Sequence, residues 1–122
     1  MSESDSTVNK GKRYEHKARV YLEQRGLKLI EHNYRGSGGE IDIVMTDGCW
    51  LVFVEVRFRR SDQFGSGAES IDHFKQARLI RCANHYLQKN AKTTQMTRFD
   101  VISIGQTNGT ETIQWIKDAI QA

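Results

Sequence analysis

Two consecutive apolar segments limit what this chain can fold into. Residues 50–56 are apolar except for Glu55, and residues 40–46 contain four more apolar residues. Such segments are typical of strands that are covered on both faces, because a strand with one face in water alternates apolar and polar residues. An Asp-Gly turn signal at 47–48 separates the two segments. They therefore predict a hairpin, over residues 40–46 and 49–57, at the centre of a sheet.

The remaining segments predict two helices and three more strands. Helical periodicity covers residues 9–25, with Gly26 as the C-cap, and residues 71–90, with Ser70 as the N-cap. The other strands are expected over residues 27–34, 98–105 and 111–116, and an Asn-Gly turn at 108–109 joins the last two. Residues 35–39 are expected to form a flexible glycine-rich loop.

The order of these elements, α-β-β-β-α-β-β, predicts an α/β fold with a mixed central sheet of about five strands flanked by helices. Residues 9–122 are expected to form a single domain, because a chain of 122 residues is large enough for one core and too small for two. Residues 1–8 are polar and serine-rich, and are expected to be a disordered tail.

The composition is that of an ordinary globular protein. A net charge of +3 and a pI near 9.0 permit a polyanionic partner without requiring one. The polar, acidic start differs from a secretory signal, and no apolar stretch reaches the length of a membrane span. Cys49 and Cys82 have neither zinc-site spacing nor a disulfide framework, so both are expected to be packing residues. The chain is expected in the cytoplasm.

Two acids of the predicted hairpin are the first candidates for function. The hairpin brings Asp42 and Glu55 together near one end of the sheet, and converging carboxylates suggest a site for Mg²⁺ or Mn²⁺ with phosphodiester chemistry. Other readings stay open for both acids. Strand alternation would put Asp42 on the opposite face from Ile41 and Ile43, where it could face solvent. Glu55 could form a salt bridge with Arg57, which lies two residues further along the same face of its strand.

Two further acids could join this site. Glu15 lies beside Ala18 and Leu22 on the rim of the first helix's apolar face, so a docked helix would present it toward Asp42. From the residues alone, the commoner arrangement is a surface glutamate paired with a neighbouring cation of that helix: Lys12, Lys17 or Arg19. Glu40 shares the face of Asp42, and either contributes to the site or stabilises the adjacent loop.

These residues resemble a known nuclease motif. Asp42, followed thirteen residues later by Glu55-Val56-Arg57 on the adjacent strand, looks like the PD-(D/E)XK motif. The surrounding chain, roughly residues 11–116, resembles the bacterial YraN family in seven segments: Gly11-x-x-Tyr14-Glu15-x-x-Ala18, Asn33-Tyr34-Arg35, Gly39-Glu40-Ile41-Asp42, Phe53-Val54-Glu55-Val56-Arg57-x-Arg59, Phe64-Gly65, Lys75-Gln76-x-Arg78 and Arg98-Phe99-Asp100-Val101.

The YraN family is similar to archaeal Holliday junction resolvases. The resemblance therefore implies a restriction-endonuclease-like fold and a metal-dependent endonuclease that acts on structured or branched DNA. By resemblance, Glu15, Asp42 and Glu55 would be the metal ligands, with Mg²⁺ or Mn²⁺ as the cofactor. Arg57 would take the position of the motif lysine and complete the catalytic set. A homodimer would suit a two-fold symmetric junction.

One departure from the family pattern matters, because the family has lysine at the position of Arg57. Arginine stays protonated and forks, so it can bind a carboxylate through two hydrogen bonds. Three carboxylates in one pocket repel one another, and we expect Arg57 to pair with Glu55, Asp42 or Glu15 when no metal is bound. This departure leaves open a second function, a nucleic-acid-binding module that has lost hydrolysis. A protein-interaction domain, with the acids only in ion pairs, is a third.

Two basic clusters suggest a surface for nucleic acid. Lys75, Arg78 and Arg81 lie within one arc of the second predicted helix, and Arg59 and Arg60 follow the central strand. Such clusters suit phosphate backbones, although a solvated helix face is the commoner explanation of any single stripe. DNA is the expected partner, but no sequence feature separates DNA from RNA.

Overall fold

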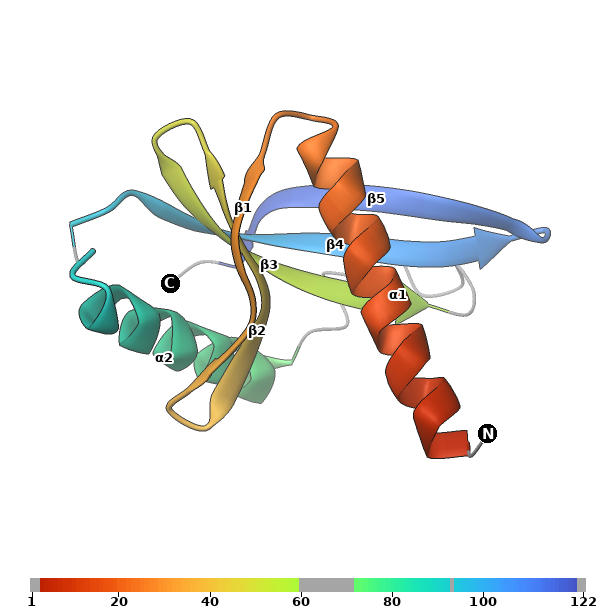
Figure 1. Ribbon diagram of the computed structural model, residues 1–122, viewed down its shortest axis with the longest axis horizontal. Helices are drawn as coiled ribbons and strands as arrows, with labels where there is room; N and C mark the ends of the chain where they lie inside the picture. The colour runs from red at the N-terminus through yellow and green to blue at the C-terminus, as the bar shows by residue number, and fades with distance from the viewer. Residues whose placement is uncertain (1–2, 60–71, 93, 121–122) are drawn as a thin grey trace.

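The computed structural model describes residues 3–59, 72–92 and 94–120, with side chains from Gly11 onward. It contains two helices and five strands (Figure 1): α1 (Glu3–Glu23), β1 (Lys28–Gly36), β2 (Gly39–Asp47), β3 (Trp50–Arg59), α2 (His73–Lys89), β4 (Thr97–Thr107) and β5 (Thr110–Ile120). This order of helices and strands is the predicted one. Among the described residues, no helix is long and apolar enough to cross a lipid bilayer.

The five strands form one mixed sheet in the order β1-β2-β3-β4-β5. Neighbouring strands are antiparallel except for β3 and β4, which are parallel and are connected through α2. A parallel pair needs such a crossover, because the chain has to return to the same end of the sheet. The predicted number of strands and the central place of β3 are confirmed.

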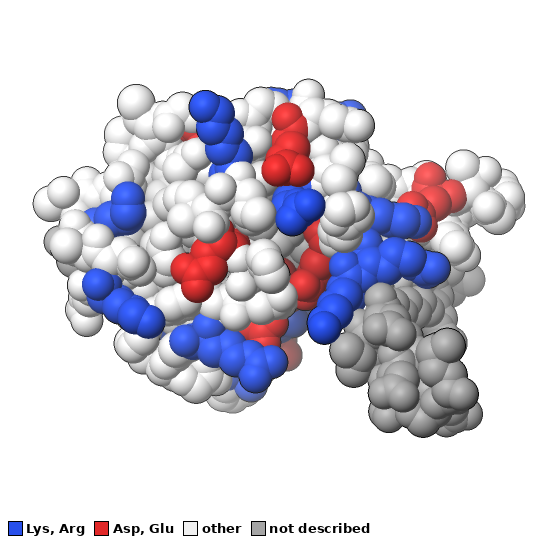
Figure 2. Space-filling model, in the orientation of Figure 1, with Lys and Arg blue, Asp and Glu red and all other residues white. Residues whose placement is uncertain are grey.

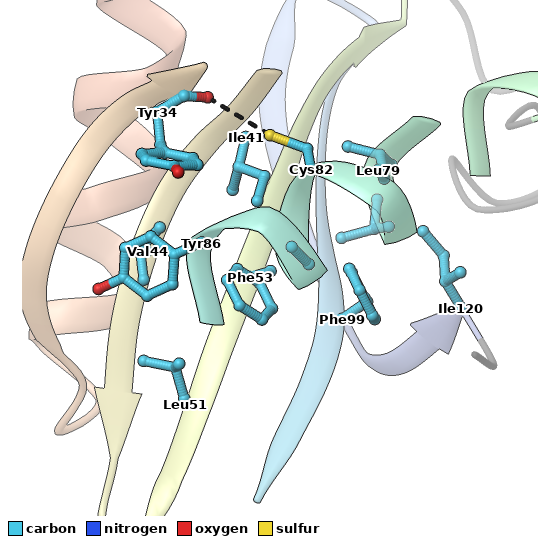
Figure 3. Close-up of a cluster of buried hydrophobic side chains, with 12 residues drawn as sticks. Tyr34, Ile41, Val44, Leu51, Phe53, Leu79, Cys82, Tyr86, Phe99 and Ile120 are labelled. Carbon is cyan, nitrogen blue, oxygen red and sulfur yellow. Dashed lines mark hydrogen bonds between the residues drawn. The ribbon is translucent and has the colours of Figure 1, made fainter. Parts of the chain in front are cut away.

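The sheet carries a hydrophobic layer on each face, because β3 contributes side chains to both. On one face, Phe53 belongs to the core that contains Leu79 and Tyr86 of α2 (Figure 3). On the other face, Val52 and Val54 of β3 pack in the core that includes the buried α1 residues Tyr14, Ala18 and Leu22. The two helices therefore cover opposite faces of the sheet, and β3 is covered on both, as its apolar sequence predicts.

The helix ends differ in part from the prediction. α1 ends at Glu23, and Gly26, the expected capping glycine, has φ +99° in the turn that follows, where the Leu27 amide donates to the Leu22 carbonyl. It begins at Glu3 rather than at residue 9, and no glycine or proline interrupts residues 3–10. α2 begins later than predicted. Its N-cap is Asp72 instead of Ser70, and the Asp72 carboxylate accepts the amide of Lys75 at 2.8 Å.

The glycine-rich segment is a tight turn instead of the expected flexible loop over residues 35–39. Gly36 pairs with Gly39, and Ser37 and Gly38 between them have φ of +53° and +76°. Two consecutive residues with positive φ match the twist of the strands and give a compact hairpin. The predicted Asn-Gly turn at 108–109, between β4 and β5, has the same pair of positive φ values and is confirmed.

The two cysteines lie in different environments. Cys82 is fully buried in α2, and its Sγ lies 3.9 Å from the carbonyl oxygen of Tyr34 (Figure 3). Cys49 is exposed in the turn before β3. The prediction of a packing cysteine is therefore confirmed for Cys82 and wrong for Cys49, because β3 begins one residue after Cys49.

A buried aspartate joins β4 to β5 and to the β2–β3 turn. Asp100 is 0% exposed, and its carboxylate accepts from Arg98 Nε at 3.0 Å and Trp115 Nε1 at 2.9 Å. The backbone amide of Asp118 donates to it as well, at 2.9 Å. Arg98 Nη2 also lies 2.8 Å from Asp47 Oδ2. The buried charge has the partners that stability requires.

Candidate metal centre

The candidate site lies where the β1–β2 hairpin rotates about its own axis. His32 pairs with Ile43 across the hairpin, and Tyr34 pairs with Ile41. Ile43 belongs to the core on the α1 face, whereas Tyr34 and Ile41 belong to the core on the α2 face. In a regular strand, residues two apart share a face. The hairpin therefore rotates between these two pairs, and the prediction that Ile41 and Ile43 share a face is wrong.

Asn33 and Asp42 lie opposite each other at this rotation. Asn33 has φ +53°, a left-handed conformation that asparagine tolerates better than most residues. The register between β2 and β3 begins with Ile43 opposite Val54. Past this pair, Asp42 Oδ2 accepts the backbone amide of Val56 at 2.9 Å. A side chain thus takes the place of a backbone partner, and Asp42 sits where groups from both helices can approach it.

Three carboxylates meet at this position, and we call them the carboxylate cluster. Oxygens of Glu15, Glu40 and Asp42 all lie within 4.8 Å of one another. α1 supplies Glu15, and β2 supplies the other two. Asn33 Nδ2 donates to Glu15 Oε1 at 3.0 Å and to Glu40 Oε1 at 3.2 Å. The structure brings Glu15 to Asp42, and it includes Glu40, whose contribution the sequence left open.

Two cations near Glu15 are engaged with other acids. Lys17 Nζ lies 2.7 Å from Glu111 Oε1, and Arg19 Nε lies 3.6 Å from Glu23 Oε1. Spacing along the helix suggested that Glu15 pairs with Lys17 or Arg19 at the surface. Among the described residues, the structure contains neither pair. The Glu15 carboxylate instead turns toward the sheet.

A cavity of about 600 Å³ opens beside the cluster on the α2 side. Acids and cations both line it: the acids are Glu40, Asp42 and Glu55, and the cations are Arg35, Lys75 and Arg78. Arg35 is paired with Glu40, with 3.0 Å between Nε and Oε2. The volume is within the range of ligand sites in proteins.

Glu55 is held by a lysine of α2. It is 7% exposed, and its Oε1 lies 2.9 Å from Nζ of Lys75, in the first turn of α2. Glu55 lines the same cavity as Asp42, but it is not among the described carboxylates that meet within 4.8 Å. The sequence placed Lys75 only on a nucleic-acid surface. Contacts between a strand and a later helix leave no local spacing signal, and this pair was therefore missed.

Arg57 lies outside this arrangement. Its strand position is paired with Ser103 of β4, and it does not line the cavity. Within the described part of the chain, Arg57 forms no ion pair with Glu55, Asp42 or Glu15. The expectation that Arg57 pairs with one of these acids is wrong, because Lys75 reaches Glu55 from α2. The alternative of an ion pair along β3 between Glu55 and Arg57 fails for the same reason.

Comparison with known proteins places the candidate site within a region that is shared with a protein family. The profile of the uncharacterised protein family UPF0102 matches residues 14–104, a range that includes the carboxylate cluster and every residue that lines the cavity. The chain belongs to this family. The resemblance to the YraN family expected from the sequence is confirmed, since UPF0102 is that family.

Relatives in UPF0102 align with nearly the whole chain. The UPF0102 protein of Nitrosococcus oceani is 45% identical over 93% of this chain and 92% of its own length. That of Hahella chejuensis is 45% identical over 93% of this chain and 90% of its own length. A third, from Janthinobacterium sp., is 47% identical over 92% of this chain and 87% of its own length. The similarity therefore extends over most of the chain.

Burial and the surrounding negative charges raise the pKa of Asp42 to about 8. Burial is the largest cause, and the negative charge of Glu55 is the next. The charges of Glu15 and Glu40 act in the same direction, whereas the hydrogen bond from the Val56 amide lowers the pKa. Together, these causes oppose the ionised form of Asp42, and a positive charge beside it would favour that form.

The donor set of this UPF0102 centre fits a hard divalent cation. Carboxylate oxygens are the ligands that Mg²⁺ and Mn²⁺ prefer, and Mg²⁺ needs only a few of them because it keeps several waters. Glu15, Glu40 and Asp42 are the residues that would hold the ion. Glu55, the third ligand expected from the resemblance, is engaged by Lys75 instead.

The predicted nucleic-acid residues do not form one uniform surface. Arg78 is exposed at the cavity, Arg81 is exposed on α2 away from the cavity lining, and Arg59 is half-buried near the end of β3. Arg60 lies outside the described residues. Figure 2 shows acidic side chains lying between lysines and arginines across one face of the molecule. The nucleic-acid surface stays a prediction, with Arg78 as the member that lies at the candidate site.

Proposed function

We propose that this UPF0102 protein is a metal-dependent endonuclease with a restriction-endonuclease-like fold that acts on structured or branched DNA. The observation that carries the proposal is the meeting of Glu15, Glu40 and Asp42 beside a cavity that contains Glu55 and Lys75. The mixed five-stranded sheet with a helix on each face is compatible with such a fold. The likeness of the family to archaeal Holliday junction resolvases supports a branched substrate.

A bound Mg²⁺ or Mn²⁺ would polarise a phosphoryl oxygen and help to activate a water for phosphodiester hydrolysis. The chain's own contribution is positioning and charge. Asn33 orients Glu15 and Glu40 through its two hydrogen bonds, and the Val56 amide fixes Asp42. On the α2 side, Lys75 and Arg78 line a cavity large enough for a phosphodiester group, whose negative charge they would offset.

Metal titration and cleavage assays test the proposal together. We expect Mg²⁺ to bind the purified protein in calorimetry, and a labelled four-way junction or flap to be cleaved with Mg²⁺ or Mn²⁺ but not with EDTA. Glu15→Gln should weaken Mg²⁺ binding at least tenfold and abolish cleavage. Glu23→Gln, on the same helix but paired with Arg19, is the matched control and should change neither. A parent protein that binds no divalent ion would contradict the proposal.

A nucleic-acid-binding module without hydrolysis is the second candidate. The specific observation in its favour is that Arg35, Lys75 and Arg78 line the cavity, so an anion has cationic neighbours there without any metal. This candidate predicts that branched DNA binds equally well with Mg²⁺ and with EDTA, and that no divalent ion produces cleavage. A gel-shift series in both buffers separates the two candidates.

A further inference from the structure

The backbone amide and the side-chain ammonium group of Lys75 are both held by carboxylates. Its backbone amide donates to the N-cap carboxylate of Asp72 at 2.8 Å, which sets the first turn of α2. Its Nζ lies 2.9 Å from the buried Glu55 carboxylate, while 38% of the Lys75 side chain remains exposed. The ammonium group therefore lies between a buried acid and the open cavity.

The tight turn of the β1–β2 hairpin is what allows α2 to lie so close. Figure 1 shows this turn beside α2. A Cβ on Gly39 would lie 2.9 Å from the backbone oxygen of Arg78, and a Cβ on Gly36 would collide with the ring of His85. Glycine at both positions lets the helix approach the hairpin. From this position Lys75 reaches Glu55.

Lys75 is also the lining cation that engages the acid of the central strand. Arg35 is bound to Glu40 on the hairpin, and Arg78 is exposed at the edge of the cavity. Arg57, at the position of the motif lysine, does not line the cavity. The cation that contacts Glu55 therefore comes from the helix and not from the strand.

We infer that Lys75, and not Arg57, is the catalytic cation of this centre, where it exchanges its contact with Glu55 for a phosphate oxygen of the bound DNA. The inference rests on the proposed function and names a residue for it. Release from Lys75 would leave Glu55 free to join Glu15, Glu40 and Asp42 toward a divalent cation. One side chain thus neutralises the acid before substrate binds and the phosphate afterwards.

The role needs no proton transfer by Lys75. In hydrolysis, a bond forms between the water oxygen and phosphorus, and the ester bond from phosphorus to the leaving oxygen breaks. The proton of the water passes to solvent, and the leaving oxygen takes a proton from solvent. The ammonium group stays charged throughout. It contributes hydrogen bonds to a phosphate oxygen whose negative charge grows toward the transition state.

Variants at the two positions separate the roles. We expect Lys75→Ala and Lys75→Gln to lower the single-turnover cleavage rate at saturating DNA by about 100-fold, the usual effect of losing one donor to a developing charge. Arg57→Ala should keep the rate within about threefold of the parent, as should Lys92→Ala, which removes an exposed lysine just after α2. Lys75→Gln retains a donor toward Glu55, so it covers the case in which the alanine variant does not fold.

Mg²⁺ calorimetry tests the contact between Lys75 and Glu55 separately from cleavage. Loss of the ammonium group frees Glu55, so Mg²⁺ should bind Lys75→Ala several-fold more tightly than the parent and Arg57→Ala with unchanged affinity. Full cleavage by both Lys75 variants, with a strong loss in Arg57→Ala, would overturn the assignment and leave the proposed function standing. If the parent cleaves no DNA, the proposed function fails. In that case, the assignment of Lys75 is also overturned if Lys75→Ala and the parent bind Mg²⁺ with equal affinity.

Discussion

A single asparagine has two tasks at the carboxylate cluster. Its backbone adopts φ +53° where the hairpin rotates, and its side-chain amide donates to both Glu15 and Glu40. Residues held in left-handed conformations often occur at functional sites, where the surrounding structure stabilises them. Asn33 thus connects the shape of the strand to the spacing of two carboxylates.

Replacing Asn33 with glycine should separate these two tasks. Glycine adopts a positive φ freely, so Asn33→Gly keeps the bend of the hairpin but loses both hydrogen bonds. We expect Mg²⁺ affinity to fall by about tenfold, as for other groups that orient metal ligands, with the fold retained. Calorimetry measures the affinity. Asn108→Gly, at another left-handed asparagine in the β4–β5 turn, is the control and should bind Mg²⁺ like the parent.

The raised pKa of Asp42 predicts how stability depends on pH without metal. The pKa is about 8 in the folded chain against 3.8 as its ordinary value, so the folded state holds this proton more tightly. The stabilisation is fully present below pH 4, declines as pH rises, and is lost once pH passes about 8. In urea titrations with EDTA, Asp42→Asn should lose less stability than the parent between pH 5 and pH 8. A parallel loss in both proteins would show that Asp42 ionises normally.

At the scale of whole elements, the position of α2 depends on the glycines of the hairpin. A Cβ at Gly39 would meet the Arg78 backbone oxygen at 2.9 Å, and a helix backbone cannot rotate away as a side chain can. The φ of Gly39 is not positive, so its backbone conformation does not require glycine. Glycine is required there because the neighbouring helix leaves no space for a Cβ. The β1–β2 turn therefore acts as the surface on which the helix rests.

Gly39→Ala should push α2 away from the sheet and loosen the contact between Lys75 and Glu55. We expect a loss of about 1–3 kcal/mol in the free energy of unfolding, the usual cost of overfilling a packed contact. Urea denaturation measures it. Gly11→Ala is the matched control, since a Cβ there meets open space and alanine favours the helix. Equal stabilities for the two variants would contradict the packing argument.

Local patterns in the sequence predict most of the elements and few of their contacts. Periodicity and turn residues give the order of helices and strands, the covering of β3 on both faces, and the turn at 108–109. They also bring Asp42 and Glu55 to one cavity. The rotation of the hairpin depends on the backbone conformation of Asn33, and the partner of Glu55 depends on where α2 rests. Neither is encoded in spacing along the chain, and Arg57 was favoured over Lys75 for that reason.

Across the whole molecule, two buried or partly buried aspartates have opposite surroundings. Asp100 accepts from Arg98, from Trp115 and from the amide of Asp118, so its charge is neutralised inside the protein. Asp42 has one backbone donor and three acids around it. The first arrangement stabilises the fold, and the second leaves negative charge for a ligand to neutralise.

Asp100→Ala should therefore cost far more stability than the removal of a surface partner of the same arginine. We expect a loss of about 3–5 kcal/mol, because Arg98, Trp115 and a backbone amide lose a buried acceptor. The other acid bound to Arg98 is Asp47, whose side chain is 33% exposed. Its removal in Asp47→Ala should cost less than about 1 kcal/mol. Urea denaturation followed by tryptophan fluorescence compares the two. Similar losses would show that the buried network is not special.

The carboxylate cluster also crosses the boundary between the first helix and the sheet. Glu15 belongs to α1, whereas Glu40 and Asp42 belong to β2, so an ion held by all three would join the helix to the sheet, in addition to their apolar packing, the Asn33–Glu15 hydrogen bond and the Lys17–Glu111 pair. Ligand binding to the folded state alone adds stability with the logarithm of its concentration. Amide hydrogen exchange in α1 should therefore slow when Mg²⁺ is added, while exchange in β4 stays the same. An ion bound for catalysis would then also hold α1 against the sheet. Removal of Mg²⁺ would loosen this helix before the sheet unfolds.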